Sequence, residues 1–322
     1  PPGPPPPGAT SSPELVALAS LPQPVSYLAA GANGLTELRL VDDLGDQRLA
    51  ADEDGFASLV WSPAGDLGLA AISSGGSRAL HVFDVRTRGA RRVMEAPAAG
   101  RLEFRVAADW SRALVHVVGG DAHELWVVDP RGGAASRLTT TAAVLAQWAI
   151  SGDGNWALAG MEAEGRYVTT LFDLARGMAH EVSDVPHPLA EFSPDGRWLA
   201  LAGREGGETL TRLRLFDLEG IAGDLTARVV ASGESVQPAV WREDGANSFF
   251  AADAGWLGAR VADAAGERVR LRRLSSGDRV ELNLEQGERL EWLLVYSSLR
   301  RVLVATSQGL PVGESARLRL WY

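Results

Sequence analysis

The pattern of apolar and polar positions along this chain repeats. A short apolar strand leads into a Ser-Pro-Asp-Gly turn, a run of small apolar residues, an alternating strand that ends in Asp, and a polar strand. The clearest copy runs from Phe192 to Gly203 and continues from Leu213 to Gly220. Pro sets the backbone for the first turn position, and Gly supplies the positive φ that a tight reversal requires. Four strands graded from apolar to polar predict one blade of a β-propeller.

Weaker copies of this pattern recur about every 42–54 residues, which is the period of propeller blades. The sequence therefore predicts an all-β fold: a seven-bladed β-propeller of four-stranded antiparallel blades, with the last or the first blade incomplete. We expect a flexible proline-rich leader over residues 1–13 and a single propeller domain over residues 14–322. The predicted blades are approximately 14–54, 55–100, 101–144, 145–188, 189–236, 237–290 and 291–322. The last of them ends where its third strand should end.

The repeat resembles the TolB-type, WD-like propeller repeats of bacteria. The phrases Ser-Pro-Asp-Gly-Arg-Trp-Leu-Ala (193–200) and Leu-Phe-Asp-Leu (215–218) carry the resemblance, which covers nearly everything after residue 13. It implies the propeller fold and leaves the function open, because proteins with such blades do very different jobs. The chain lacks the extra α/β domain of TolB itself, and its seven units exceed the six expected there.

Composition narrows the possible functions. A net charge of −10 and a pI near 5.1 disfavour nucleic acid as a partner. The chain has no cysteine, and all 31 basic residues are arginine. Thiol catalysis, disulfides, Schiff-base chemistry and a Walker-type lysine are therefore excluded. No apolar run reaches the roughly 18 residues that span a bilayer, so we predict no transmembrane segment.

The leader, Pro1 to Gly8, is typical of a stiff, extended spacer. It favours a processed, exported chain, and an arbitrary chain boundary is the alternative. We expect a bacterial protein in the periplasm, associated with the outer membrane or outside the cell. An N-terminal lipid or linker tether would be compatible with this location.

Candidate catalytic, cofactor and metal residues are not evident in the sequence. An aspartate closes the third strand of five blades, and turn capping explains it better than a metal site does; the five are Asp42, Asp84, Asp129, Asp173 and Asp217. The five histidines show no zinc spacing, and no Gly-x-Ser-x-Gly elbow is present. We therefore predict no catalytic residue, no cofactor and no metal.

Candidate partner-binding residues come from the expected loops and from the end of the chain. The loops that should emerge on one face of the propeller are rich in Asp and Glu, which would attract a basic partner; ordinary solvated loops are the alternative. Trp256 lies in an expected long insertion, residues 255–266, of the sixth blade. The unpaired edge of the last blade is a template for another chain. The candidates are Asp52, Asp54, Glu162, Glu205, Trp256, Arg260, Arg319, Trp321 and Tyr322.

These observations lead to one predicted function and two alternatives. We predict a protein that is not an enzyme: a non-catalytic scaffold of the bacterial envelope or of an exported assembly, which binds another protein through a propeller face or the edge of the last blade. The first alternative is a propeller enzyme, such as a lactonase, lyase or hydrolase, with an axial site. The second is a carbohydrate-binding propeller. An enzyme requires convergent polar groups, whereas small apolar second strands favour the scaffold.

Overall fold

The computed structural model describes most of the chain beyond residue 24. The described residues are 25–31, 34–42, 45–54, 56, 58–97, 100–183, 189–203, 212–220, 227–228, 235–241, 247–253, 255–263, 266–284, 288–296, 301–308 and 317–321. Within them every regular element is a β-strand except one 3-10 turn, η3 (Leu218–Gly220). This part of the chain holds no helix with the length and apolarity needed to cross a membrane. The chain divides into two compact units, residues 1–102 and 103–322.

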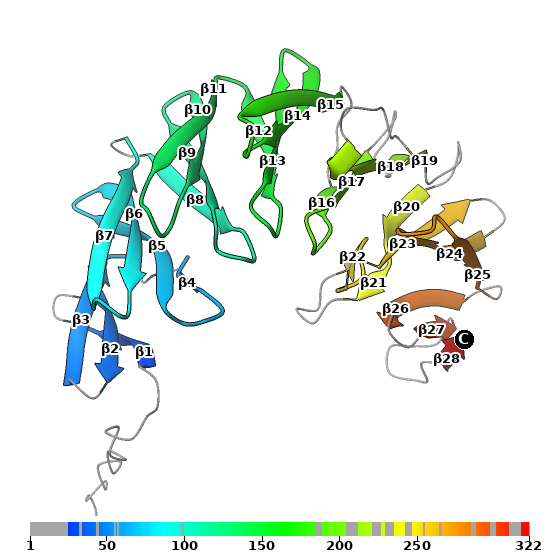
Figure 1. The fold of residues 1–322 in the computed structure, drawn as a ribbon, viewed down its shortest axis with the longest axis horizontal. Helices are drawn as coiled ribbons and strands as arrows, with labels where there is room; N and C mark the ends of the chain where they lie inside the picture. The colour runs from blue at the N-terminus through cyan, green and yellow to red at the C-terminus, as the bar shows by residue number, and fades with distance from the viewer. Residues whose placement is uncertain are drawn as a thin grey trace, which may run out of the picture. The chain divides into compact units, whose positions relative to one another are not determined.

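The first unit contains two antiparallel sheets (Figure 1). One is three-stranded, in the order β1–β2–β3; the strands are β1 (Val25–Ala30), β2 (Thr36–Asp42) and β3 (Gly45–Asp52). The other is four-stranded; its strands are β4 (Val60–Trp61), β5 (Leu67–Ser74), β6 (Ser77–Asp84) and β7 (Gly89–Glu95). Residues 14–24, where the predicted first blade begins, lie outside the described residues.

The second unit begins with three four-stranded antiparallel sheets, each in chain order. The first holds β8 (Arg101–Val106), β9 (Ala113–Gly119), β10 (Ala122–Val128) and β11 (Ala135–Thr141). The second holds β12 (Val144–Ile150), β13 (Trp156–Ala163), β14 (Arg166–Asp173) and β15 (Met178–Ser183). The third holds β16 (Leu189–Phe192), β17 (Trp198–Gly203), β18 (Arg212–Asp217) and β19 (Ala227–Arg228).

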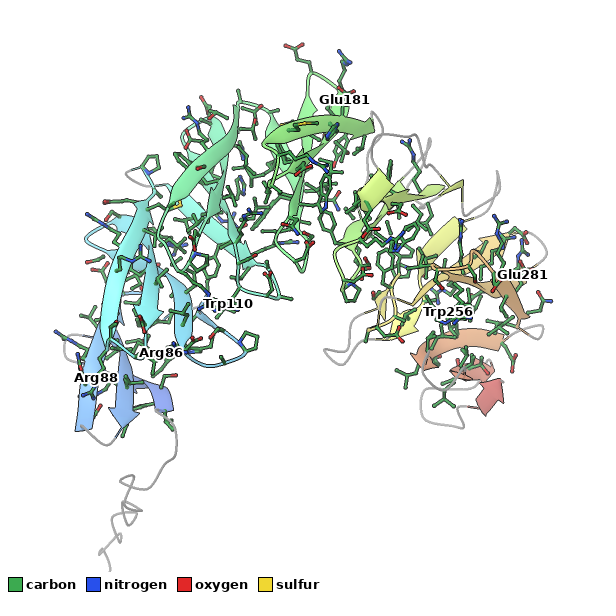
Figure 2. All side chains as sticks on the ribbon, viewed as in Figure 1. Arg86, Arg88, Trp110, Glu181, Trp256 and Glu281 are labelled. Atoms are coloured by element: carbon green, nitrogen blue, oxygen red, sulfur yellow. The ribbon has the colours of Figure 1, made fainter. Side chains whose placement is uncertain are left out.

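The last two sheets differ from the predicted blade boundaries. One has the order β20–β23–β24–β25; its strands are β20 (Ser235–Pro238), β23 (Trp256–Asp263), β24 (Gly266–Arg273) and β25 (Arg279–Asn283). The other has the order β22–β21–β26–β27–β28; its strands are β21 (Val240–Trp241), β22 (Asn247–Ser248), β26 (Glu288–Tyr296), β27 (Arg301–Gln308) and β28 (Arg317–Trp321). The predicted insertion, residues 255–266, therefore contains β23 and the first residue of β24, and Trp256 begins a strand (Figure 2).

Strand β21 leaves the predicted sixth blade for a physical reason. It pairs in parallel with β26, with Val240 opposite Leu293. Both side chains are buried in the cluster that also holds Ala239 and Val304. Burying Val240 there removes apolar surface from water, and this stabilisation decides which sheet β21 joins. The resemblance of residues 241–245 to the repeated turn does not decide it.

The hydrophobic core lies between successive sheets. In the first unit, a cluster around Leu38 and Phe83 joins the two sheets. In the second unit, each pair of neighbouring sheets shares one cluster, built around Leu125 and Trp148, Leu158 and Leu199, Ala200 and Leu257, and Val269 and Val304. Face-to-face packing of four-stranded sheets through such layers is the architecture of propeller blades. That the seven sheets close into one ring stays a prediction.

The repeated turn is held by a buried serine. In three copies of the turn, the hydroxyls of Ser62, Ser151 and Ser193 accept the N–H of the residue that opens the next strand. Gly65, Gly154 and Gly196 adopt a positive φ, as the pattern predicts. Trp110 takes the corresponding position in the fourth copy with φ 60° and is buried (Figure 2). Packing of its indole therefore compensates for a backbone conformation that disfavours bulky residues.

The aspartates at the ends of the third strands cap turns, as predicted. The carboxylates of Asp84, Asp129, Asp173 and Asp217 each accept a backbone N–H two residues further along the chain. Within the part of the chain that the structure describes, no three His, Cys, Asp or Glu side chains are grouped so that they could hold a metal ion. Turn capping therefore accounts for these four members of the aspartate column.

Candidate functional site

Two histidines meet on neighbouring strands of the second unit. The Nε2 atom of His116, on β9, lies 3.0 Å from the Nδ1 atom of His123, on β10. Their rings are stacked, with centroids 5.3 Å apart and planes 16° apart. The register explains the meeting, because Leu125 opposes His116 and Val118 opposes His123, which makes the two histidines diagonal neighbours on one face. His116 is buried and His123 is half-buried.

Trp148 extends this pair toward an arginine. The His116 ring lies 5.8 Å from the ring of Trp148, on β12 of the next sheet. The guanidinium carbon of Arg105, on β8, lies 4.7 Å from the centre of the same indole ring. His123, His116, Trp148 and Arg105 thus form a continuous row between two sheets, which we call the junction site. The cation–π contact fixes the guanidinium while much of the Arg105 side chain stays exposed.

The electrostatics of the junction site favour an anion. Burial lowers the pKa of the Arg105 guanidinium, and the nearby Glu103 carboxylate opposes this shift. The arginine remains fully charged at neutral pH because its ordinary value lies so high. Between the two histidines, one nitrogen must carry the proton and the other must accept the hydrogen bond. The site therefore combines a fixed positive charge with a proton that a small movement can transfer.

The sequence-predicted residues Asp52 and Asp54 serve the first unit's own structure. Asp52 is buried, and its carboxylate accepts the N–H groups of Asp54, Phe56 and Ser73. The Asp54 carboxylate accepts the Ser73 hydroxyl and forms an ion pair with Arg78 at 2.6 Å, and these two contacts, the Ser73 hydrogen bond first, lower its pKa. Asp52 is thus a turn cap, and Asp54 is exposed but already paired.

The other predicted residues are dispersed over the second unit. Glu162 is exposed near the end of β13. Arg260 lies on β23, with its Nε atom 3.7 Å from Glu267. Trp256 is partly buried against the cluster around Val269 and Leu271. Glu205 and Tyr322 lie outside the described residues; Arg319 and Trp321 are described only as backbone of β28, opposite Val304 and Val302.

No sequence motif marks the junction site. His116 and His123 are seven residues apart, which matches no metal or catalytic motif. The available signal was a histidine on each side of Gly119-Gly120-Asp121, residues that favour a turn. Pairing them requires the strand register, and adding Trp148 requires the packing of the next sheet.

Comparisons with known proteins bear on the fold. No family model matches the chain, and no curated protein matches it. Among solved structures, a eukaryotic initiation factor is 14% identical, with a TM-score of 0.53, over 81% of this chain and 63% of that one. An oligogalacturonate lyase in complex with manganese is 14% identical, with a TM-score of 0.49, over 92% and 85% of the two chains. TolB from Acinetobacter baumannii is 13% identical, with a TM-score of 0.38, over 88% and 76%.

These likenesses establish the class of protein. The chain has a β-propeller fold, as the repeated phrase predicts: its described strands form successive antiparallel sheets, and it matches a solved structure with a TM-score of 0.53. They also correct one prediction. The sequence led us to expect a protein that is not an enzyme, and that prediction is wrong, because the structures similar to this chain include enzymes such as oligogalacturonate lyase. Contiguous motifs do not reveal such sites, because propellers assemble polar groups from separate strands.

Proposed function

We propose that this protein is a β-propeller enzyme that binds an anionic substrate at the junction site and transfers a proton through His116 and His123. One observation carries the proposal: the direct contact of the two imidazoles at 3.0 Å, beside an arginine fixed on an indole ring. Histidine is the side chain best suited to proton transfer near neutral pH.

The geometry suggests a separate role for each residue of the junction site in binding the substrate and transferring the proton. Arg105 would hold a carboxylate or phosphate group, since its guanidinium presents several donors in a fixed plane. Both Arg105 and His116 contact Trp148, so the guanidinium carbon and the imidazole centre lie at most about 10.5 Å apart. A small substrate anchored at Arg105 can span that distance. His123, the more exposed member, would exchange the proton with solvent while His116 faces the substrate.

A panel of small carboxylate and phosphate substrates tests this proposal. The wild type should turn over at least one member. His116→Gln should reduce kcat by about 10²–10⁴-fold, the usual contribution of a general acid or base. Arg105→Gln should mainly raise KM, because it removes the group that holds the anion in the bound and the reacting state alike.

His180→Gln provides a matched control. His180 lies on β15, opposite Leu171 of the neighbouring strand, and has no part in the junction site. Its substitution should leave turnover unchanged. The proposal is wrong if the folded wild type turns over no member of the panel, or if His116→Gln retains full kcat on the substrate found.

Protein binding is a second candidate function. Val25, Tyr27 and Leu28 are exposed on β1, at the end of its sheet among the described strands. Apolar side chains on such an edge favour the addition of an extended segment from a partner protein. A photo-crosslinking residue at position 28 should capture one protein that the same residue at exposed Val144 does not. Leu28→Arg should abolish the capture, and equal capture at both positions would contradict strand addition. Membership of an exported or envelope assembly stays a prediction.

A further inference from the structure

Two arginines face each other across the outer hairpin of the sheet β20–β23–β24–β25. Arg272, near the end of β24, is the register partner of Arg279, the first residue of β25. Like charges directly opposite each other on antiparallel strands destabilise the pair. The hairpin therefore carries a local excess of positive charge that needs an explanation.

The neighbouring acids on this hairpin are engaged elsewhere. Glu281, labelled in Figure 2, forms ion pairs with Arg270 at 2.8 Å and with Arg268 at 3.6 Å. The Asp278 carboxylate accepts the hydroxyl of Ser276. Across the ranges that the structure covers, neither Arg272 nor Arg279 forms an ion pair with any carboxylate. Among the described residues, no acid on the hairpin therefore pairs directly with Arg272 or Arg279.

One hydrogen-bond donor of the Arg272 guanidinium also lacks an acceptor among the described residues. Its Nη1 atom is buried and has no hydrogen-bond partner among the described atoms. Burial lowers the pKa of Arg272, and the positive charge of Arg279 lowers it further, so the two guanidinium groups lie within each other's field. A buried donor without an acceptor costs roughly 1–3 kcal/mol, more when charged. Arg279 is exposed, so the pair opens to solvent on one side.

We propose that Arg272 and Arg279 form a binding site for a phosphate group. One dianion balances the charge of both guanidinium groups, and its oxygens can accept hydrogen bonds from each of them. Arginine pairs suit phosphate because each planar fork donates two parallel hydrogen bonds. The site is separate from the junction site: it uses β24 and β25, whereas the junction site uses β8, β9, β10 and β12.

Inorganic phosphate at constant ionic strength, balanced with chloride, tests the proposal. The melting temperature of the wild type should rise with phosphate and then saturate, and isothermal titration should give one site. Arg279→Gln should weaken phosphate binding by about tenfold or more, as expected when a hydrogen bond to a charged group is lost. Arg166→Gln is the matched control, because Arg166 is an exposed arginine on β14; it should bind phosphate like the wild type.

A charge reversal separates binding from a purely structural role. Arg279→Glu places a carboxylate opposite Arg272, so it should raise the melting temperature without phosphate and abolish the response to phosphate. Glycerol phosphate, titrated in parallel, distinguishes the source of the ligand: tighter binding of the ester assigns the site to an esterified phosphate, and tighter binding of the free ion to inorganic phosphate. The proposal is overturned if the wild type shows no saturable response, or if Arg279→Gln responds as strongly as the wild type.

Discussion

Replacing Ser193 by Ala tests the physical role of the repeated turn. The Ser193 hydroxyl is buried, accepts the N–H of Trp198 at 2.9 Å and donates to the carboxylate of Asp195. Alanine removes both bonds and leaves the Trp198 N–H without its acceptor. The backbone bonds of the turn remain, because Ser193 N–H still donates to the carbonyl of Trp198.

The expected loss of unfolding free energy follows from the hydrogen bonds that Ser193→Ala removes. One orphaned backbone donor and one lost hydroxyl bond should lower the free energy of unfolding by about 2 kcal/mol. Urea unfolding followed by circular dichroism measures the loss as a shift in midpoint at an unchanged slope. Ser276→Ala is the control: Ser276 also donates to an aspartate, but it is exposed. Its cost should stay within about 0.5 kcal/mol. Equal effects of the two substitutions would refute the role assigned to the buried serine.

Three further predictions follow from buried polar contacts. Asp52→Asn should destabilise the first unit by about 2 kcal/mol, since an amide cannot accept all three N–H groups, and faster amide hydrogen exchange there measures the effect. Glu191→Gln should cost about 2 kcal/mol in urea unfolding, because the Glu191 carboxylate accepts the Ser248 hydroxyl and the backbone N–H of Phe249. Burial of His81, helped by Arg92, lowers its pKa below 6.5. The folded state therefore binds this proton less readily than the unfolded state, and stability should fall as pH drops below 6.5. His81→Gln should flatten that dependence.

Local chemistry made much of the fold predictable. The turns around Ser62, Ser151 and Ser193 are specified within a few residues, because Ser, Asp and Gly act on the backbone beside them. The aspartate caps follow from the same short-range hydrogen bonding. The predicted strand order is wrong around residues 235–266. A copy of the turn phrase that begins at Trp241 suggested that this segment belongs to the sixth blade, but Val240 packs in the last sheet. That packing is a long-range contact, which no local pattern records.

The junction site lay beyond sequence reasoning for a related reason. Each of its histidines occupies an ordinary alternating strand, and either alone is typical of a core residue. Their contact depends on the β9–β10 register, and their link to Arg105 depends on Trp148 from another sheet. The candidate residues were chosen because they were acidic or expected in exposed loops. Aspartates that cap turns, such as Asp52, meet the same criteria.

A double-mutant comparison of kcat tests most directly whether His116 and His123 act as one proton-transfer unit. The single variants His116→Gln and His123→Gln and the double variant would be measured on the substrate that the panel identifies. Groups that act together lose their effect together, so the double variant should be no slower than the slower single variant. Losses that multiply in the double variant, or a His123→Gln variant as fast as the wild type, would contradict the account.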